Sequence, residues 1–193
     1  MAYTPKILAF AGSTRSESLN KKLIRVGAEA AREAGAEVTL IDLRDYPLPL
    51  YDGDLEARDG LPENGRKLKD LFLANDGLLI SSPEYNNSFS AVFKNTIDWV
   101  SRPVEGYPPL ECFTGKVAGL MSASPGYFGG MRGLFDVRKL LSMIAVDVLP
   151  DQVAVPKANT VFNDNGELTD EGIHKRVVAL GARLTDTINK LKG

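Results

Sequence analysis

The stretch FAGSTRSESLN, near the start of the chain, concentrates side chains that can bind an anion. Ser13 and Ser18 offer hydroxyl donors, Asn20 adds an amide, and Arg15 supplies a positive charge with a forked set of donors. Gly12 permits a sharp turn after an apolar run. We therefore expect a phosphate-binding loop, and an ordinary turn with Ser18 as the cap of the next helix is the alternative.

A second stretch, SSPEYNN at residues 81–87, offers a stiff turn and an aromatic face. Pro83 restricts the backbone, Tyr85 presents a flat surface, and Asn86 carries an amide. A planar heteroaromatic ligand needs such a wall, with backbone N–H and C=O groups for its edge. The alternative is that Tyr85 covers the core and the asparagines form a turn.

A third stretch, SASPGYFGGMRG at residues 122–133, is rich in glycine. Gly126 lets the backbone approach a ligand closely, and Ser124 offers a hydroxyl. Tyr127 and Phe128 are costly in an exposed loop unless they pack on a ligand or on a second subunit. The alternative is a flexible turn whose aromatic side chains fold inward.

The residue types that are scarce also limit the chemistry. The single histidine, His174, falls on the polar side of the closing amphipathic run, which argues against a Ser-His-Asp triad and a histidine-rich metal site. The single cysteine, Cys112, rules out an internal disulfide and a zinc site with several thiolates. Since no acid–base machinery is evident, we expect a cofactor to carry the chemistry and no metal to be bound.

Length and composition indicate one ordinary globular domain spanning residues 1–193. Apolar residues make up 44% of the chain, charged residues make up 25%, and the formal net charge is −2. This balance gives no basic field for nucleic acid. The opening apolar run is too short to span a membrane and lacks the basic start of a secretory signal, so we expect a cytoplasmic protein without a membrane partner.

Apolar runs of strand length alternate with amphipathic runs of helix length. The patterns predict strands at 6–11, 38–41, 77–81, 117–122 and 146–149, and helices at 19–34, around 68–72, and at 88–101, 133–145 and 170–191. Residues 151–166 are expected to be irregular. The alternation predicts an α/β three-layer fold with a parallel sheet, in which ligands bind after the carboxyl ends of the strands.

Taken together, these stretches resemble the NADPH-dependent FMN reductase family of flavodoxin-like proteins, which includes quinone, chromate and azo-compound reductases. GSTRSESLN is similar to the family's phosphate loop, and PEYNNSFSAVFKNTIDWVSRP to its Pro-Glu-Tyr-Asn segment with the following helix. SASPGYFGGMRG resembles its third flavin loop, and LPLYDGDLE its second crossover. The resemblance covers nearly the whole chain and implies a five-stranded sheet of order 2-1-3-4-5.

The resemblance also implies a cofactor and its site. FMN would be the cofactor and NADPH or NADH the co-substrate, with hydride passing through N5 of the flavin and no catalytic side chain. The residues implied around the phosphate are Ser13, Arg15, Ser18, Leu19 and Asn20. The residues implied to border the isoalloxazine ring are Pro83, Glu84, Tyr85 and Asn86, with Ser124 and Gly126 closing the ring side.

One departure from the family pattern concerns the start of the helix after the second stretch. Ser90 and Ala91 stand where many members have Pro-Gly, which bears on how closely that helix approaches the flavin. The resemblance further implies a small-molecule electron acceptor, such as a quinone, a flavin, an azo compound or chromate. We expect a homodimer or homotetramer, because the flavin loops need a second wall that Tyr127, Phe128 and Trp99 would provide.

Three other functions are compatible with the same architecture. A flavodoxin-type one-electron carrier ranks lower, because its phosphate loop is typically richer in threonine and glycine and lacks an arginine at this place. A non-catalytic FMN-binding redox module would act through a partner. A cofactor-free α/β domain would be colourless and would ignore added FMN.

Overall fold

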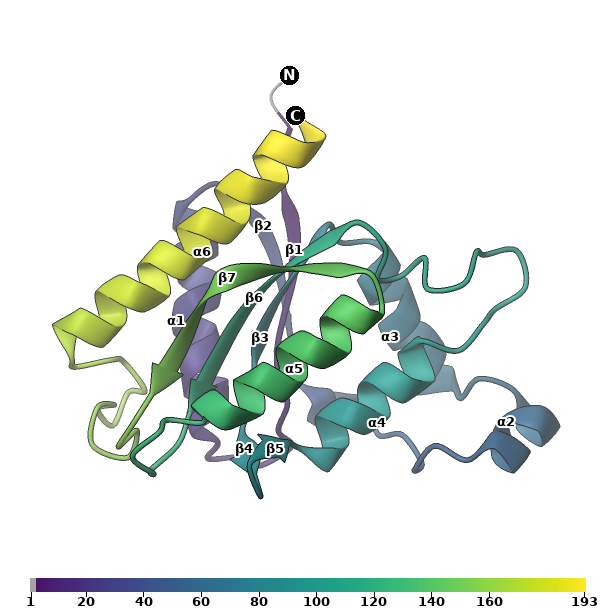
Figure 1. The fold of residues 1–193 in the computed structure, drawn as a ribbon, viewed down its shortest axis with the longest axis horizontal. Coiled ribbons are helices and arrows are strands. Elements are labelled where there is room, and N and C mark those ends of the chain that lie inside the picture. Colours follow the sequence, from purple (N-terminus) through teal and green to yellow (C-terminus); the bar gives the residue numbers. More distant parts are fainter. Residues whose placement is uncertain (1–2) are drawn as a thin grey trace.

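A computed structural model describes residues 3–193 and shows a five-stranded parallel sheet with helices on both sides (Figure 1). The sheet order is β2-β1-β3-β6-β7, which is the predicted order 2-1-3-4-5 when the five strands are counted along the chain. The strands are β1 (Lys6–Ala11), β2 (Glu37–Ile41), β3 (Gly77–Ser81), β6 (Lys116–Ala123) and β7 (Val146–Val155). The expected three-layer fold is thus confirmed.

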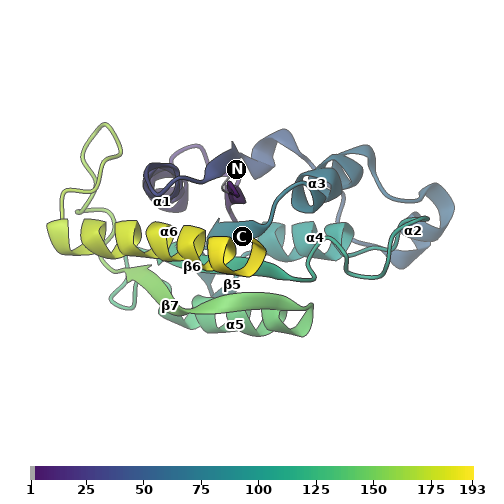
Figure 2. The same ribbon diagram turned by 90° about the horizontal axis from the view of Figure 1, so that it is seen from above.

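The two faces of the sheet carry separate apolar cores. One face packs on α1 (Leu19–Glu33) and α6 (Glu171–Lys192), and the other on α3 (Glu63–Leu73), α4 (Ala91–Val100) and α5 (Met131–Met143); Figure 2 shows these layers from above. In β1, Ile7 and Ala9 belong to the first core, whereas Leu8 and Phe10 belong to the second. This alternation explains why the strands are continuous apolar runs in the sequence.

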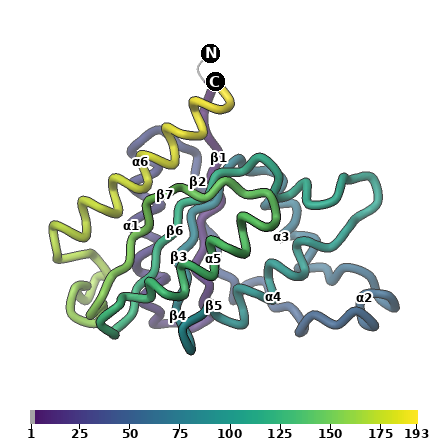
Figure 3. The backbone as a smooth tube through the Cα atoms, viewed as in Figure 1, coloured from purple at the N-terminus to yellow at the C-terminus, as the bar shows by residue number. Residues whose placement is uncertain are grey.

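A long excursion separates β2 from β3 and reaches one end of the molecule (Figure 3). It contains a 3₁₀ turn, η1 (Leu43–Asp45), and a helix, α2 (Gly53–Asp59), that the sequence analysis did not predict. Asp52 begins α2 by accepting a hydrogen bond from the N–H of Asp54 at 2.9 Å. In the sequence, the dense glycines and prolines of this segment indicate only a loop.

The expected irregular region at 151–166 begins later than predicted, because β7 continues to Val155. Ala118 pairs with Val148, but Leu120 pairs with Gln152, so β7 contains extra residues at this point. Pro150 lies within them, and a proline is tolerated at a bulge in an edge strand because its missing N–H breaks no ladder hydrogen bond there.

The helix expected from residue 88 begins at Ala91, because a small hairpin precedes it. Its strands are β4 (Glu84–Tyr85) and β5 (Ser88–Phe89). Asn86 and Asn87 join them with φ angles of 51° and 66°. Positive φ at both central residues is characteristic of the tight turn that suits hairpins.

The register of the sheet brings three loops to one edge. Ala11 lies opposite Ser81, and Ser81 lies opposite Met121, so the segments that follow β1, β3 and β6 leave the sheet side by side. The β4–β5 hairpin is at this lower edge in Figure 1. No helix within residues 3–193 has the length and apolar character needed to cross a membrane.

Candidate functional site

The β1–α1 loop, residues 12–18, presents unpaired donors beside a positive charge. The first turn of α1 contains no acidic residue, and Ser18 makes no side-chain cap. Within residues 3–193, no acceptor meets the backbone N–H groups of Leu19 and Asn20. Ser13 and Ser18 are buried, whereas Arg15 is exposed. The loop therefore has the donors and the helix end that bind a phosphate. Ser18 is the N-cap residue of α1 and Arg15 is exposed, as the alternative expected, but the Ser18 side chain makes no capping hydrogen bond.

A glycine suits position 12 because α4 approaches it closely, and not because of the sharp turn that the sequence predicted. Its φ is not in the left-handed region, but a Cβ at this position would lie 3.1 Å from Cβ of Phe93 in α4. Ser90 begins α4: its Oγ accepts a hydrogen bond from the N–H of Phe93 at 3.2 Å. The same hydroxyl donates to the carbonyl of Gly12 at 2.6 Å. Ser90 thus connects the start of α4 directly to the β1–α1 loop.

Asn20 is buried and connects this loop to two other strands. Its Oδ1 accepts from the hydroxyl of Ser81 at 2.9 Å and from the N–H of Ala123 at 3.0 Å. Its Nδ2 donates to the carbonyl of Ala123 at 2.9 Å. The side-chain amide therefore faces the ends of β3 and β6 and positions the loop, while a phosphate contact through its backbone N–H stays a prediction.

The second loop is tied to α5 through Glu84. The Oε2 atom of Glu84 accepts from the N–H of Gly133 at 2.9 Å, in the first turn of α5, and its Oε1 pairs with Arg132 at 2.8 Å. A carboxylate is favourable at a helix N-terminus because it meets the positive end of the helix dipole. Glu84 therefore fixes the backbone on either side of it, from Pro83 to Tyr85.

The aromatic side chain in the second loop is available to a ligand. Tyr85 is 52% exposed, so it does not cover the core. Asn86 and Asn87 form a turn, as the alternative interpretation of this stretch expected. The predicted contact of Tyr85 and Asn86 with a ring is compatible with this exposure.

The third loop projects its aromatic side chains outward. Tyr127 is 81% exposed and Phe128 48% exposed, so the alternative in which they fold inward is wrong. The guanidinium of Arg132 lies 4.8 Å from the centre of the Phe128 ring. Ser124 and Gly126 belong to one turn, in which the N–H of Gly126 donates to Oγ of Ser124 at 3.1 Å.

Gly130 closes the third loop in a conformation that admits no side chain. Its φ is 86°, and a Cβ would lie 1.9 Å from Oγ of Ser122. That hydroxyl is the one buried side-chain polar atom of residues 3–193 without a hydrogen-bond partner. The backbone therefore passes directly over the end of β6, which brings the start of α5 close to the second loop.

Trp99 does not have the role that the sequence predicted, and Arg44 has a role that the sequence did not predict. Trp99 is fully buried and its Nε1 donates to the carbonyl of Pro49 at 2.8 Å, so it cannot contribute to a wall between subunits as expected. Arg44, which the sequence analysis did not single out, donates from Nε to the carbonyl of Thr14 at 2.9 Å. No local pattern could identify Arg44, because its partner is 30 residues away.

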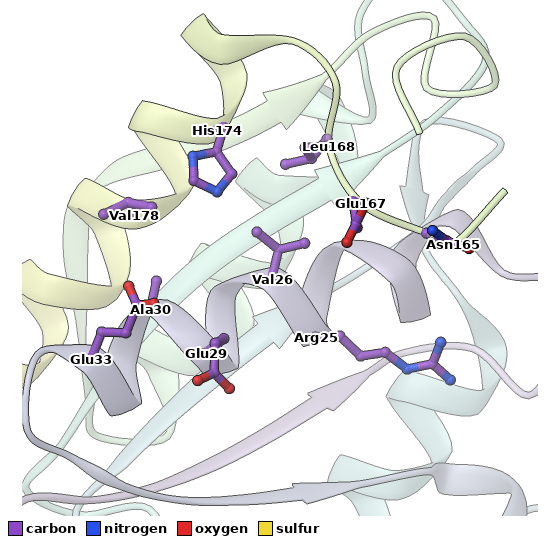
Figure 4. Close-up of a pocket in the computed structure, with 11 residues that line it drawn as sticks. Arg25, Val26, Glu29, Ala30, Glu33, Asn165, Glu167, Leu168, His174 and Val178 are labelled. Atoms are coloured by element: carbon purple, nitrogen blue, oxygen red, sulfur yellow. The ribbon is translucent and has the colours of Figure 1, made fainter. Parts of the chain in front are cut away.

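A separate cavity of about 550 Å³ lies between α1, α6 and the segment 165–168 (Figure 4). In Figure 4, His174 and Val178 come from α6 and lie across from Val26 and Ala30 of α1. None of the expected cofactor residues line it, and the guanidinium of Arg25 is outnumbered there by three carboxylates, those of Glu29, Glu33 and Glu167. Such a lining repels a phosphate, so this cavity is not the expected site.

Outside these loops, the described residues include one thiol and no cluster of metal-binding side chains. Cys112 is buried, and burial raises the pKa of its thiol, which keeps it protonated and unreactive. Within residues 3–193, no three His, Cys, Asp or Glu side chains are grouped to hold a metal ion.

Comparison with known proteins points to the same family as the sequence motifs. The family model described as NADPH-dependent FMN reductase matches residues 5–160. The chain is 32% identical over 189 residues to an NAD(P)H-dependent FMN reductase of Pseudomonas aeruginosa, with 97% of each chain covered. It is 31% identical over 172 residues to a quinone reductase of Pseudomonas putida, covering 89% of this chain and 88% of that protein.

A solved structure also resembles the whole chain. It is a flavoenzyme NAD(P)H:acceptor oxidoreductase from Paracoccus denitrificans, with a TM-score of 0.81 and 28% sequence identity. The alignment covers 97% of this chain and 98% of that one.

Proposed function

This chain belongs to the NADPH-dependent FMN reductase family, and from that membership we infer that it is an FMN-dependent NAD(P)H oxidoreductase whose β1–α1 loop binds the FMN phosphate. The observation that carries the placement of the phosphate is the set of unpaired N–H groups at the start of α1 beside Arg15. A phosphate monoester carries a charge of about −1.5 to −2 at neutral pH and accepts several hydrogen bonds. The donor set of this loop fits that group.

The ring of FMN is proposed to lie between the second and third loops. Bound there, FMN would supply the transfer of hydride and electrons between a nicotinamide and an acceptor. Tyr85 offers an exposed aromatic face, and the backbone from Pro83 to Asn86 offers polar groups for the ring edge. Ser124 and Gly126 would close the ring side. The side chains bind and orient, and none acts as a nucleophile or general base.

The substrates follow from the same proposal. NADPH or NADH would be the electron donor, and quinones, flavins, azo compounds or chromate the small-molecule acceptors. Tyr127 and Phe128 project at the edge of the proposed site, where they would contact an aromatic acceptor or a second copy of the chain. A homo-oligomer is therefore part of the proposal, and so is a cytoplasmic location.

An absorption spectrum of the purified protein tests the proposal directly. We expect a flavin spectrum, or its appearance on adding FMN to the apoprotein, and rapid bleaching when NADPH or NADH is added without oxygen. Steady NAD(P)H oxidation with a quinone would then separate a reductase from an electron carrier or a non-catalytic FMN-binding module. A colourless protein that does not bind added FMN would contradict the proposal.

A further inference from the structure

Arg44 makes the long-range contact that holds the middle of the β1–α1 loop, whereas Ser90 holds its first residue, Gly12. Both hydrogen bonds that join residues 13–17 to another element of the described chain come from its guanidinium, whose Nε and terminal nitrogen donate to the carbonyl of Thr14. Thr14 and Arg44 both border a cavity of about 260 Å³. Within the described chain, the carbonyl of Thr14 accepts no hydrogen bond from any other residue.

The position of Arg44 is itself fixed by a charged network. Its backbone N–H donates to Oδ1 of Asp42 at 3.0 Å, and Oδ2 of Asp42 accepts from Nζ of Lys21 at 2.5 Å. Lys21 is buried in the first turn of α1. The network therefore connects the loop to α1 through Asp42, the residue that follows β2.

The carbonyl of Thr14 decides the direction of a neighbouring donor. In a planar trans peptide, the C=O of one residue and the N–H of the next point in opposite directions. Because Arg44 holds the Thr14 carbonyl, the N–H of Arg15 points away from Arg44, where it meets Oγ of Ser13 at 3.3 Å. That bond uses the hydroxyl as an acceptor, and its own hydrogen has no acceptor within residues 3–193 and is free to donate to an anion.

We propose that Arg44 is a positioning residue for the cofactor phosphate: it orients the Thr14–Arg15 peptide and the Ser13 hydroxyl without touching the phosphate. This rests on the proposed function, because it takes the β1–α1 loop as the phosphate site. It adds a residue outside the motif that the sequence predicts to bind the phosphate.

The test compares FMN with riboflavin, which has the same ring and no phosphate. Apoprotein is titrated with each compound, and binding is followed by quenching of flavin fluorescence. Arg44→Met removes the guanidinium but keeps most of the apolar stem. We expect the Kd for FMN to rise about five- to tenfold, equivalent to one ordinary hydrogen bond, and the Kd for riboflavin to stay unchanged.

Two further variants separate positioning from simple charge. Arg32→Met removes the same charge at the opposite end of α1, where Arg32 likewise donates to a carbonyl, that of Val38; we expect no change for either compound. Arg44→Lys keeps the charge but loses the fork, so we expect it to bind FMN about as weakly as Arg44→Met. Wild-type FMN affinity in Arg44→Lys would show that Arg44 acts only as a charge and would overturn the proposal.

A double-variant cycle with Ser13→Ala tests the route of the effect. If Arg44 acts through the Ser13 hydroxyl, the double variant should lose less FMN affinity than the product of the two single losses. Independent, multiplicative losses would overturn the proposal.

The failure of the phosphate site and the failure of this inference have different signatures. A wild-type apoprotein that binds FMN no tighter than riboflavin would refute the phosphate site itself. A wild type that prefers FMN, together with an Arg44→Met variant that keeps this preference, would refute the role of Arg44 alone. Equal weakening of FMN and riboflavin in Arg44→Met would show a general distortion and would also overturn it.

Discussion

The β1–α1 loop and the β6–α5 loop lie at the same edge of the sheet but are held differently. The first is held by hydrogen bonds from the side chains of Ser90 and Arg44 and keeps its donors free. At the start of the following helix, the side chain of Asn20 binds the ends of β3 and β6. The second is held by backbone hydrogen bonds of Ser124 and Gly126 with the segment around Val155, and it projects two aromatic rings into solvent, those of Tyr127 and Phe128.

This difference matches two different requirements. A charged group of constant shape is best bound by donors whose positions are fixed before it arrives, because ordering them on binding would reduce the affinity. Electron acceptors of different shapes are better bound by exposed aromatic rings that can change their orientation. We therefore assign cofactor affinity to the first loop and acceptor contact to the second, and the predictions below test that division.

Asn20→Ala should have the largest effect, because it removes three hydrogen bonds at the buried end of the first loop. The N–H and C=O of Ala123 would lose their partner, and each unsatisfied buried group costs about 1–3 kcal/mol. We expect the free energy of unfolding, measured in urea by circular dichroism, to fall by about 3 kcal/mol.

Asn87→Gly is the matched control for Asn20→Ala. It removes an exposed amide at the same edge, at a position whose φ of 66° glycine adopts without strain, so stability should change little. If Asn20→Ala also changes stability by less than 1 kcal/mol, the first loop is not held in the way described.

Arg15→Met should separate cofactor affinity from stability. Arg15 is exposed, so the variant should fold normally, but a lost charged hydrogen bond of about 1.5–3 kcal/mol corresponds to about a ten- to hundredfold weaker affinity for FMN. Riboflavin affinity should not change. Arg58→Met, in the exposed helix α2, is the control of equal charge. An equal loss for both flavins would place Arg15 beside the ring instead.

Tyr127→Ala should change acceptor use without changing cofactor affinity. Since the ring is 81% exposed, we expect the unfolding free energy to change by less than about 0.5 kcal/mol. The KM for an aromatic quinone should rise severalfold, while the Kd for FMN stays constant. Tyr107→Ala removes a 49% exposed tyrosine after α4 and should leave both values unchanged. A weaker FMN affinity in Tyr127→Ala would contradict the assignment of cofactor affinity to the first loop and acceptor contact to the second.

Asp42→Asn should produce the smallest effect, visible as a dependence of stability on pH. Burial raises the pKa of Asp42, but hydrogen bonds from Lys21 and from the N–H of Arg44 outweigh it, so the pKa lies below 3.8. A depressed carboxyl pKa stabilises the folded state above its unfolded value, and this contribution is lost as the pH falls through the folded pKa.

Thermal unfolding of the wild type and Asp42→Asn between pH 7 and pH 2 measures this contribution. The wild type should have the higher Tm at neutral pH, and the difference should shrink below pH 3.8. Since the Asp42 side chain is 37% exposed, the difference should be small. A difference that stays constant down to pH 2 would show that the charge of Asp42 is not responsible.

Local sequence patterns predict much of the fold and the types of side chain in the candidate site. Alternate burial of Ile7 to Phe10 on two apolar faces produces the continuous run that predicts a central strand. The position of Arg15 between a strand and a helix start predicts an anion site, because a helix begins with free N–H groups. The strand extension to Val155 was missed, because a bulge with Pro150 interrupts the pattern.

The amino-acid sequence by itself determined the order of strands and helices along the chain and the concentration of donors after β1, since these depend on neighbouring residues. Only the tertiary structure decided which side chains hold the loops. Arg44 reaches Thr14 across 30 residues, Glu84 reaches Gly133 across 49, and Asn20 reaches Ala123 across 103. Contacts of that separation arise from the parallel register of β2, β1, β3 and β6, which aligns the strand ends, and no local pattern encodes them.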